Sequence, residues 1–151
     1  MKLEKAIQQS SFTSNDQKIT LNFMYTYNWF KEEHKNFFKP YGITPQQYNA
    51  LRILRGAHPD PYTTSQIRDR MLDKMSDASR IVDRLVKKDL VKRSTTKKDK
   101  RLVDVVISDV GLALLKELDK PLEPHMSGFF KKLSKEEKQL FNELLDKMRN
   151  N

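Results

Sequence analysis

Cationic side chains gather in one stretch of the chain, from Lys74 to Arg101. This stretch contains eleven Lys or Arg residues and four Asp residues, a net charge of +7, while the whole chain of 151 residues carries +9. A protein that is basic only for solubility would spread its charge along the sequence. The concentration therefore indicates a polyanionic partner, and nucleic acid is the partner that a local cationic segment favours.

Four polar side chains near the start of this stretch can form hydrogen bonds with the edges of bases: Ser76, Asp77, Ser79 and Arg80. An arginine can donate two hydrogen bonds to a guanine, and a carboxylate can accept one from the amino group of a cytosine. Asp77 can instead orient Arg80, one helical turn away, or simply complement the positive N-terminus of a helix. The sequence leaves these three roles for Asp77 open.

A second cationic group follows in a polar run that contains Lys97, Lys98, Asp99, Lys100 and Arg101. Apolar segments flank the run on both sides, so we expect it to form the tip of a hairpin. Such a tip can reach a minor groove or its phosphates. A basic turn on its own is more often only a solvated one, but beside a basic helix the DNA contact is the better interpretation.

The elements that position these groups are predicted from the spacing of apolar residues. A helix over residues 75–88 has an inward face formed by Ala78, Ile81, Val82 and Leu85. Its outward face carries Arg84, which either contacts phosphate or only solvates the helix. Strands over residues 90–94 and 102–107, rich in β-branched side chains, form the hairpin.

Four further helices begin at capping boxes, in which Ser or Thr stands three residues before Gln or Glu. The boxes start at Ser14, Thr44, Thr63 and Ser134. They predict helices over residues 15–38, 45–56 and 64–71 and one that begins at residue 135. The third of these precedes the helix at 75–88 after a tight connection at residues 72–74.

One more helix, capped by Ser108, is predicted over residues 109–118, and residues 1–13 are expected to be a frayed arm or a short docking helix. Pro121 and Pro124 should kink or interrupt the chain after residue 118, because proline removes a helical hydrogen bond and clashes with the preceding turn. Only 37% of the residues are hydrophobic. Spread over long helices, so low a fraction suggests that a partner subunit completes part of the core.

Residue types needed for other functions are scarce. The chain has no cysteine, which excludes disulfides, Cys-ligated zinc and thiol redox sensing. Its three histidines lack the spacing of metal ligands, and its four glycines form no phosphate-binding loop. No run approaches the ~18 apolar residues of a membrane-spanning helix. We therefore expect a cytoplasmic protein with no catalytic residues, no metal, no cofactor and no membrane partner.

Two short helices joined by a tight turn and followed by a basic hairpin are typical of a winged helix-turn-helix. The major groove admits one α-helix, and the second helix of such a pair enters it with its N-terminal half at the base edges. The predicted fold class is thus mainly α with a small β-hairpin wing. The helices before and after this lobe complete the fold.

The order of these parts resembles the MarR family of bacterial transcriptional regulators. The residues that carry the likeness form four motifs in sequence, Gly42 to Tyr48, Ser79 to Leu85, Asp99 to Arg101 and Ile107 to Gly111. With the flanking helices, the resemblance covers nearly the whole chain. It implies residues 1–42 as an N-terminal dimerisation region, residues 43–108 as the DNA-binding lobe and residues 109–151 as C-terminal dimerisation helices, in a single integrated domain.

The resemblance also implies how such a protein works. Family members are homodimers that bind pseudo-palindromic double-stranded DNA operators, often as repressors, and many release DNA when a small aromatic or phenolic ligand binds. In the family, the residue matched by Asp99 holds the wing tip and the one matched by Arg101 enters the minor groove. The expected DNA-binding residues are Ser65, Lys74, Ser76, Asp77, Ser79, Arg80, Arg84, Lys97, Lys98, Asp99, Lys100 and Arg101.

Aromatic residues could provide the ligand pocket. The candidates are Trp29, His34, Tyr41 and Tyr48. A stripe of aromatic residues at helical spacing is more often core or dimer packing, and that alternative stays open. A second function stays open, a winged-helix module that binds another protein and not DNA. The balance of acidic and basic residues on the second helix favours it, whereas the concentration of charge between Lys74 and Arg101 argues against it.

Three positions of the DNA-binding lobe depart from the family's pattern, and Pro121 and Pro124 depart from it in the long helix that follows. Asp89 stands where the family usually has glycine after the second helix, and it has to adopt a left-handed backbone conformation there. Met75 and Asp77 replace the commoner Arg and Ser or Thr. The base sequence that the family prefers is therefore not transferable to this chain.

Overall fold

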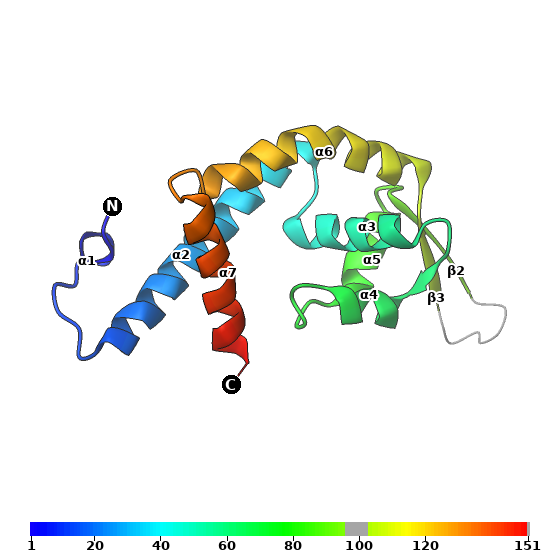
Figure 1. Ribbon diagram of the computed structural model, residues 1–151. Coiled ribbons are helices and arrows are strands. Elements are labelled where there is room, and N and C mark those ends of the chain that lie inside the picture. The colour runs from blue at the N-terminus through cyan, green and yellow to red at the C-terminus, as the bar shows by residue number, and fades with distance from the viewer. Residues whose placement is uncertain (96–102, 151) are drawn as a thin grey trace. The chain divides into compact units, whose positions relative to one another are not determined.

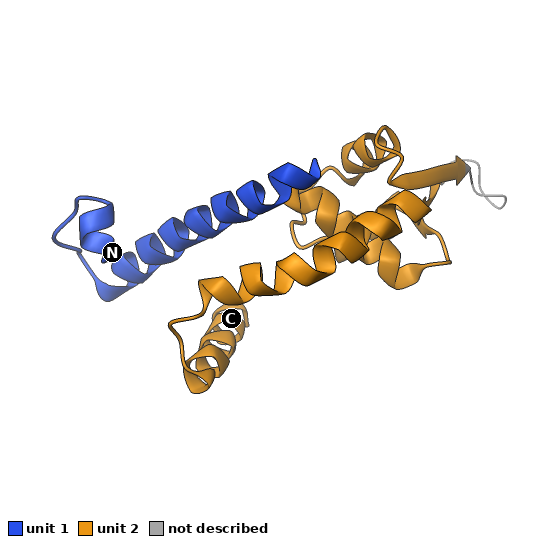
Figure 2. Cartoon of the chain, turned by 90° about the horizontal axis from the view of Figure 1, so that it is seen from above, with its two compact units in different colours: residues 1–42 blue, residues 43–151 orange. Residues whose placement is uncertain are grey.

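The computed structural model describes residues 1–95 and 103–150 of the chain. These residues form two compact units, Met1–Gly42 and Ile43–Asn151 (Figure 2). The boundary follows Gly42, whose positive φ of 68° is a conformation that glycine adopts without steric cost.

The first unit is helical. It consists of α1 (Leu3–Ala6), α2 (Asn15–Phe38) and the 3₁₀ turn η1 (Lys39–Tyr41). The Ser14 hydroxyl caps α2 by accepting a hydrogen bond from the Gln17 amide at 3.1 Å, which confirms the helix predicted over residues 15–38. Lys18 Nζ lies 2.6 Å from Glu4 Oε1, and this hydrogen bond lowers the pKa of the Glu4 carboxyl. The short helix α1 is thereby tied to the first turn of α2.

The second unit has its core among three helices, α3 (Pro45–Ala57), α4 (Thr64–Arg70) and α5 (Ala78–Val86) (Figure 1). Thr44 and Thr63 each form a complete capping box at the start of α3 and α4, as predicted. The largest fully buried side chains of these helices and the turn after α4 are Leu51, Leu54, Ile67, Met71 and Leu85. Burial of this apolar surface is the main force that holds the helix pair α4 and α5 against α3.

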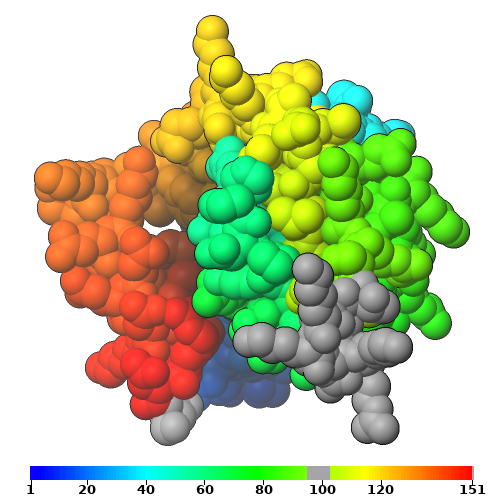
Figure 3. Space-filling view, turned by 90° about the vertical axis from the view of Figure 1, so that its right-hand side faces the viewer, coloured from blue at the N-terminus to red at the C-terminus, as the bar shows by residue number. Residues whose placement is uncertain are grey.

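A three-stranded antiparallel sheet closes one side of this core. Its order is β1 (Tyr62–Thr63), β3 (Val103–Ile107), β2 (Val91–Thr95), and β3 buries Val105 and Ile107 at alternate positions, as a half-buried strand does. The hairpin of β2 and β3 confirms the predicted wing strands, whereas β1 was not predicted. In the space-filling view α3 lies directly against the segment where β3 leads into the next helix, without a gap (Figure 3).

Two helices complete the chain, α6 (Asp109–Phe129) and α7 (Lys135–Arg149). Of the kink or interruption predicted at Pro121 and Pro124, the interruption does not occur, because α6 continues through both prolines. The helix curves along its length (Figure 1). Each proline removes one helical hydrogen bond. The carbonyls left without that donor belong to the exposed residues Glu117 and Lys120, where water can satisfy them.

The beginning of α6 approaches the segment between α5 and β2 closely. The Ser108 hydroxyl accepts a hydrogen bond from the Gly111 amide at 3.0 Å and donates one to the Asp89 carbonyl at 2.6 Å. The Ser108 amide donates to the Leu90 carbonyl at 3.1 Å. A side chain at Gly111 would place its Cβ 2.3 Å from that same carbonyl oxygen, so only glycine fits there.

Asp89, in the turn after α5, has a φ of +57°, which confirms the left-handed conformation expected at this position. A residue with a Cβ is strained in this region by about 1 kcal/mol, and glycine is not. We therefore expect Asp89→Gly to raise the melting temperature by about 2–4 °C, as measured by calorimetry. Lys88→Gly in the same turn is the matched control, because φ of Lys88 is not positive; it should lower the melting temperature. A lower melting temperature for Asp89→Gly would contradict the argument.

Among residues 1–95 and 103–150, no helix combines the length and the apolar character that crossing a membrane requires.

Candidate nucleic-acid interface

The connection between α4 and α5 is longer than the sequence suggested. The predicted helix at residues 75–88 in fact begins at Ala78, so that Met75 and Ser76 belong to the turn at residues 71–77. The reason is local hydrogen bonding. The Asp73 carboxylate accepts from the Met75 amide at 3.0 Å, and the Asp77 carboxylate caps α5 by accepting from the Arg80 amide at 3.0 Å. Both bonds favour turn over helix for the residues between them.

Asn49 on α3 holds the first residues of this turn by a hydrogen bond. Its Oδ1 accepts a hydrogen bond from the Leu72 amide at 2.9 Å, and its side chain is buried. The Nδ2 group is also buried and has no hydrogen-bond partner among the described residues. Asn49 thus holds the start of the turn. In the sequence, a polar residue on the apolar face of the predicted helix at residues 45–56 was the signal for such a contact.

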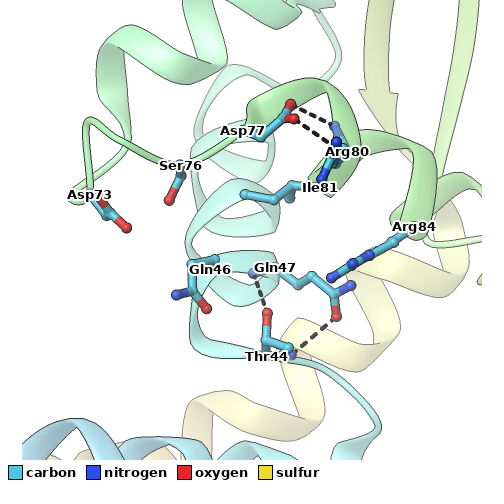
Figure 4. A pocket seen from close by; sticks show the side chains of 9 residues that line it. All are labelled: Thr44, Gln46, Gln47, Asp73, Ser76, Asp77, Arg80, Ile81 and Arg84. Carbon is cyan, nitrogen blue, oxygen red and sulfur yellow. Dashed lines mark hydrogen bonds and ion pairs between the residues drawn. The ribbon is translucent and has the colours of Figure 1, made fainter.

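Asp77 and Arg80 form a pair at the start of α5. Besides the capping bond, Arg80 Nε lies 3.1 Å from Asp77 Oδ2 (Figure 4). The Arg80 side chain is 80% exposed, so this pair holds a projecting guanidinium whose remaining N–H groups face solvent. An arginine oriented in this way keeps two parallel donors available for a planar acceptor such as guanine.

One hollow of about 330 Å³ lies between α5 and the N-terminus of α3 (Figure 4). Arg84 reaches across it toward Gln47, whose amide bonds to Thr44 in the capping box. Ile81, predicted to face inward, is only partly buried and lines the hollow. The lining residues are Thr44, Gln46, Gln47, Asp73, Ser76, Asp77, Arg80, Ile81 and Arg84.

A second hollow, of about 370 Å³, lies between α4 and α5. It brings together five of the predicted DNA-binding residues, Ser65, Lys74, Ser76, Asp77 and Ser79, and adds Thr64, Arg68, Met75 and Ala78. Two cations and four hydroxyl groups lie in this concave surface beside the Asp77 carboxylate, which is paired with Arg80. The cations and hydroxyl groups suit the oxygens of a phosphate backbone. The sequence-based prediction missed Thr64 and Arg68; Arg68 follows Ser65 by one helical turn, and this spacing was the available signal.

The wing is joined to α5 by an ion pair between Arg93 on β2 and Asp83 on α5. This contact fixes the base of the hairpin relative to the helix that carries Arg80. The tip residues Lys97, Lys98, Asp99, Lys100 and Arg101 lie outside the described residues, and their contact with DNA stays a prediction.

The four candidate pocket residues belong to both units. Trp29, His34 and Tyr41 lie in the first unit, where His34 stacks on Phe30 with ring centroids 4.3 Å apart and Tyr41 lies 5.8 Å from Phe37. Each contact joins two residues four apart in the sequence, the first within α2 and the second between α2 and η1. Tyr48 lies on α3 in the second unit, where burial raises the pKa of its hydroxyl and Arg55 and Arg52 oppose the shift. A pocket that combines the four residues stays a prediction.

Within residues 1–95 and 103–150, no cluster of His, Asp or Glu has the arrangement of a metal site.

Comparison with known proteins agrees with this architecture. The sequence profile of the MarR family matches residues 41–102. The crystal structure of a MarR transcription factor from Planctomyces limnophilus is 32% identical, covers 90% of this chain and 98% of its own, and superposes with a TM-score of 0.70.

Two more distant structures share the fold. The S. aureus MepR–DNA complex is 20% identical with a TM-score of 0.77, over 91% of this chain and 97% of that one. Bordetella bronchiseptica BpsR, whose DNA binding is regulated by 6-hydroxynicotinic acid, is 20% identical with a TM-score of 0.76, over 88% and 99%. Together with the helix-turn-helix and its wing, the 32% identity over nearly the full length of both chains shows that this protein belongs to the MarR family of transcriptional regulators.

Proposed function

We propose that this protein binds a specific double-stranded DNA operator in the cytoplasm and represses the adjacent gene. The observation that carries the proposal is the hollow between α4 and α5, where cations and hydroxyl groups surround the start of α5. In this proposal α5 lies in the major groove, Arg80 contacts base edges, and Arg68 and Lys74 contact phosphates. Phosphate contacts position the protein, and base contacts select the sequence.

The proposal includes a homodimer bound to a pseudo-palindrome. Its support is the apolar surface that each unit leaves exposed. On α2 these residues include Ile19, Phe23, Met24, Tyr27 and Trp29, and on α7 they are Leu140, Phe141, Leu144 and Met148. No described residue of α7 is buried, although its apolar side chains share one face, so a second copy of the chain is the expected cover. A two-fold dimer that places both α5 helices on one DNA face requires half-sites about 10 bp apart.

Release by a small aromatic or phenolic ligand is the third part of the proposal. It is supported by the aromatic side chains of α2 and α3 and by the likeness to BpsR, whose DNA binding responds to 6-hydroxynicotinic acid. Fluorescence anisotropy of a bound duplex, titrated with a panel of hydroxylated aromatic acids, tests this part separately from DNA binding.

The decisive experiment for DNA binding is a mobility-shift titration with the DNA upstream of the protein's own gene, at several salt concentrations. Several phosphate contacts make the logarithm of the binding constant fall steeply and linearly with the logarithm of salt concentration. Binding that is absent, or insensitive to salt, would contradict the proposal and favour a winged-helix module that binds another protein.

Two substitutions distinguish the capping of α5 by Asp77 from its ion pair with Arg80. Asp77→Ala removes the cap of α5 and should cost about 1 kcal/mol of stability, whereas Asp77→Asn keeps a capping oxygen and should leave the melting temperature unchanged. Both remove the ion pair with Arg80, so both should weaken the discrimination at one base pair. The measurement is competition binding with duplexes varied at each position, beside thermal denaturation. If Asp77→Asn matches the unsubstituted protein in both assays, Asp77 only caps the helix.

A further inference from the structure

The turn between α4 and α5 exposes two large apolar side chains to solvent. Met75 is 93% exposed and Leu72 is 83% exposed. All other exposed large hydrophobic side chains among the described residues of the second unit lie on α6 or α7. These two residues therefore stand apart from the apolar surface that a second copy of the chain is expected to cover.

Met75 and Leu72 differ in their surroundings. Met75 lines the hollow between α4 and α5 together with Ser65, Arg68, Lys74 and Ser79, whereas Leu72 does not line it. The backbone at Met75 is fixed, because its amide donates to Asp73 Oδ1 at 3.0 Å. The hollow thus combines cationic and hydroxyl groups with one flexible apolar side chain, whose backbone is held in place.

This combination fits the edge of duplex DNA. A polyanionic partner matches Arg68 and Lys74, and in the major groove the C5-methyl group of thymine is the apolar group that a base pair presents. Met75 stands two residues before Asp77, the cap of α5, so it lies beside the residues proposed to contact bases. A methionine side chain is unbranched and polarisable, and it adapts to a small apolar contact.

We propose that Met75 packs against the C5-methyl group of a thymine and makes this protein prefer thymine at that position of each half-site. The inference rests on the proposed DNA binding and adds a specificity-determining residue to it. Arg80 selects by hydrogen bonds, and Met75 selects by burial of a methyl group.

The test replaces thymine by deoxyuridine, which removes only the methyl group. A duplex is first selected by the protein from a randomised library, and each thymine of one half-site is then replaced in turn. At one position the unsubstituted protein should bind about fourfold more weakly to the deoxyuridine duplex. Met75→Ala should bind the thymine and deoxyuridine duplexes equally well at that position, and Met75→Leu should retain the penalty.

Leu72→Ala is the matched control, because it truncates another exposed apolar side chain of the same turn, one that does not line the hollow. It should keep the fourfold penalty. A penalty that persists in Met75→Ala, or an unsubstituted protein indifferent to every replacement, would overturn the assignment of Met75 while leaving DNA binding intact. A protein that selects no duplex at all would contradict the proposed function, and the role of Met75 with it.

Discussion

Replacing Arg80 and Arg84 together by glutamate is expected to reduce binding to operator DNA by about 100-fold or more, while the chain keeps its fold. Both side chains lie on the exposed face of α5, and the change reverses four units of charge where the phosphates and bases are proposed to lie. Each lost base contact of an arginine costs about 1–3 kcal/mol. The carboxylates of the introduced glutamates also repel the phosphate backbone of the DNA. Anisotropy titration at fixed salt gives the affinity, and circular dichroism reports the fold.

The control for this experiment is Lys131→Glu with Lys132→Glu, which makes the same change of charge in the exposed segment between α6 and α7. This pair lies outside the proposed interface and should weaken binding only through the net charge, by a much smaller factor that vanishes at higher salt. Equal losses for the two double variants would show that α5 has no special role and that only total charge matters.

Gly111→Ala is expected to give the largest loss of stability of any single methyl addition considered for this chain. The new Cβ would lie 2.3 Å from the Leu90 carbonyl oxygen and 2.8 Å from Ile107 Cγ1. The first of these is a backbone atom that already accepts a hydrogen bond from the Ser108 amide, so it cannot move without breaking that bond. We expect a loss of about 3 kcal/mol, or a melting temperature lower by about 6–12 °C.

Gly128→Ala provides the comparison within the same helix, since nothing lies within 4 Å of a Cβ added there. Alanine is a better helix former than glycine, so this variant should be as stable as the unsubstituted protein or up to about 1 kcal/mol more stable. Thermal denaturation of both variants measures the two changes in melting temperature. If both substitutions shift the melting temperature in the same direction, close packing at Gly111 is not what limits that position.

Local signals made much of this fold predictable from the sequence. Ser14, Thr44, Thr63 and Ser134 lie where a side-chain oxygen can satisfy the free amides of a first helical turn, and each does so. Such contacts span only three residues, so they can be recognised without knowledge of the tertiary structure. The wing strands were predictable for a similar reason, because β-branched residues follow one another on both sides of a polar run.

The start of α5 and the strand β1 could not be predicted in this way. Asp73 and Asp77 are both able to cap a helix, and Asp77 is the one that caps α5. Asn49, which is far away in the sequence, holds the Leu72 amide at the start of the turn between α4 and α5. Strand β1 has only two residues and exists because β3 lies beside it. Arg68 lies one helical turn from Ser65, but its place in one hollow with residues of α5 depends on how α4 packs against α5.

The hydroxyl of Ser108 has a consequence for the way this region opens. It bonds both to the Asp89 carbonyl and to the Gly111 amide, so the turn after α5 and the first turn of α6 share one side chain. The two turns separate only if the bonds from Ser108 to the Asp89 and Leu90 carbonyls both break. In native-state hydrogen exchange, the amides of Leu90, Ser108 and Gly111 should therefore exchange with one common free energy of opening, as members of a single cooperative unit.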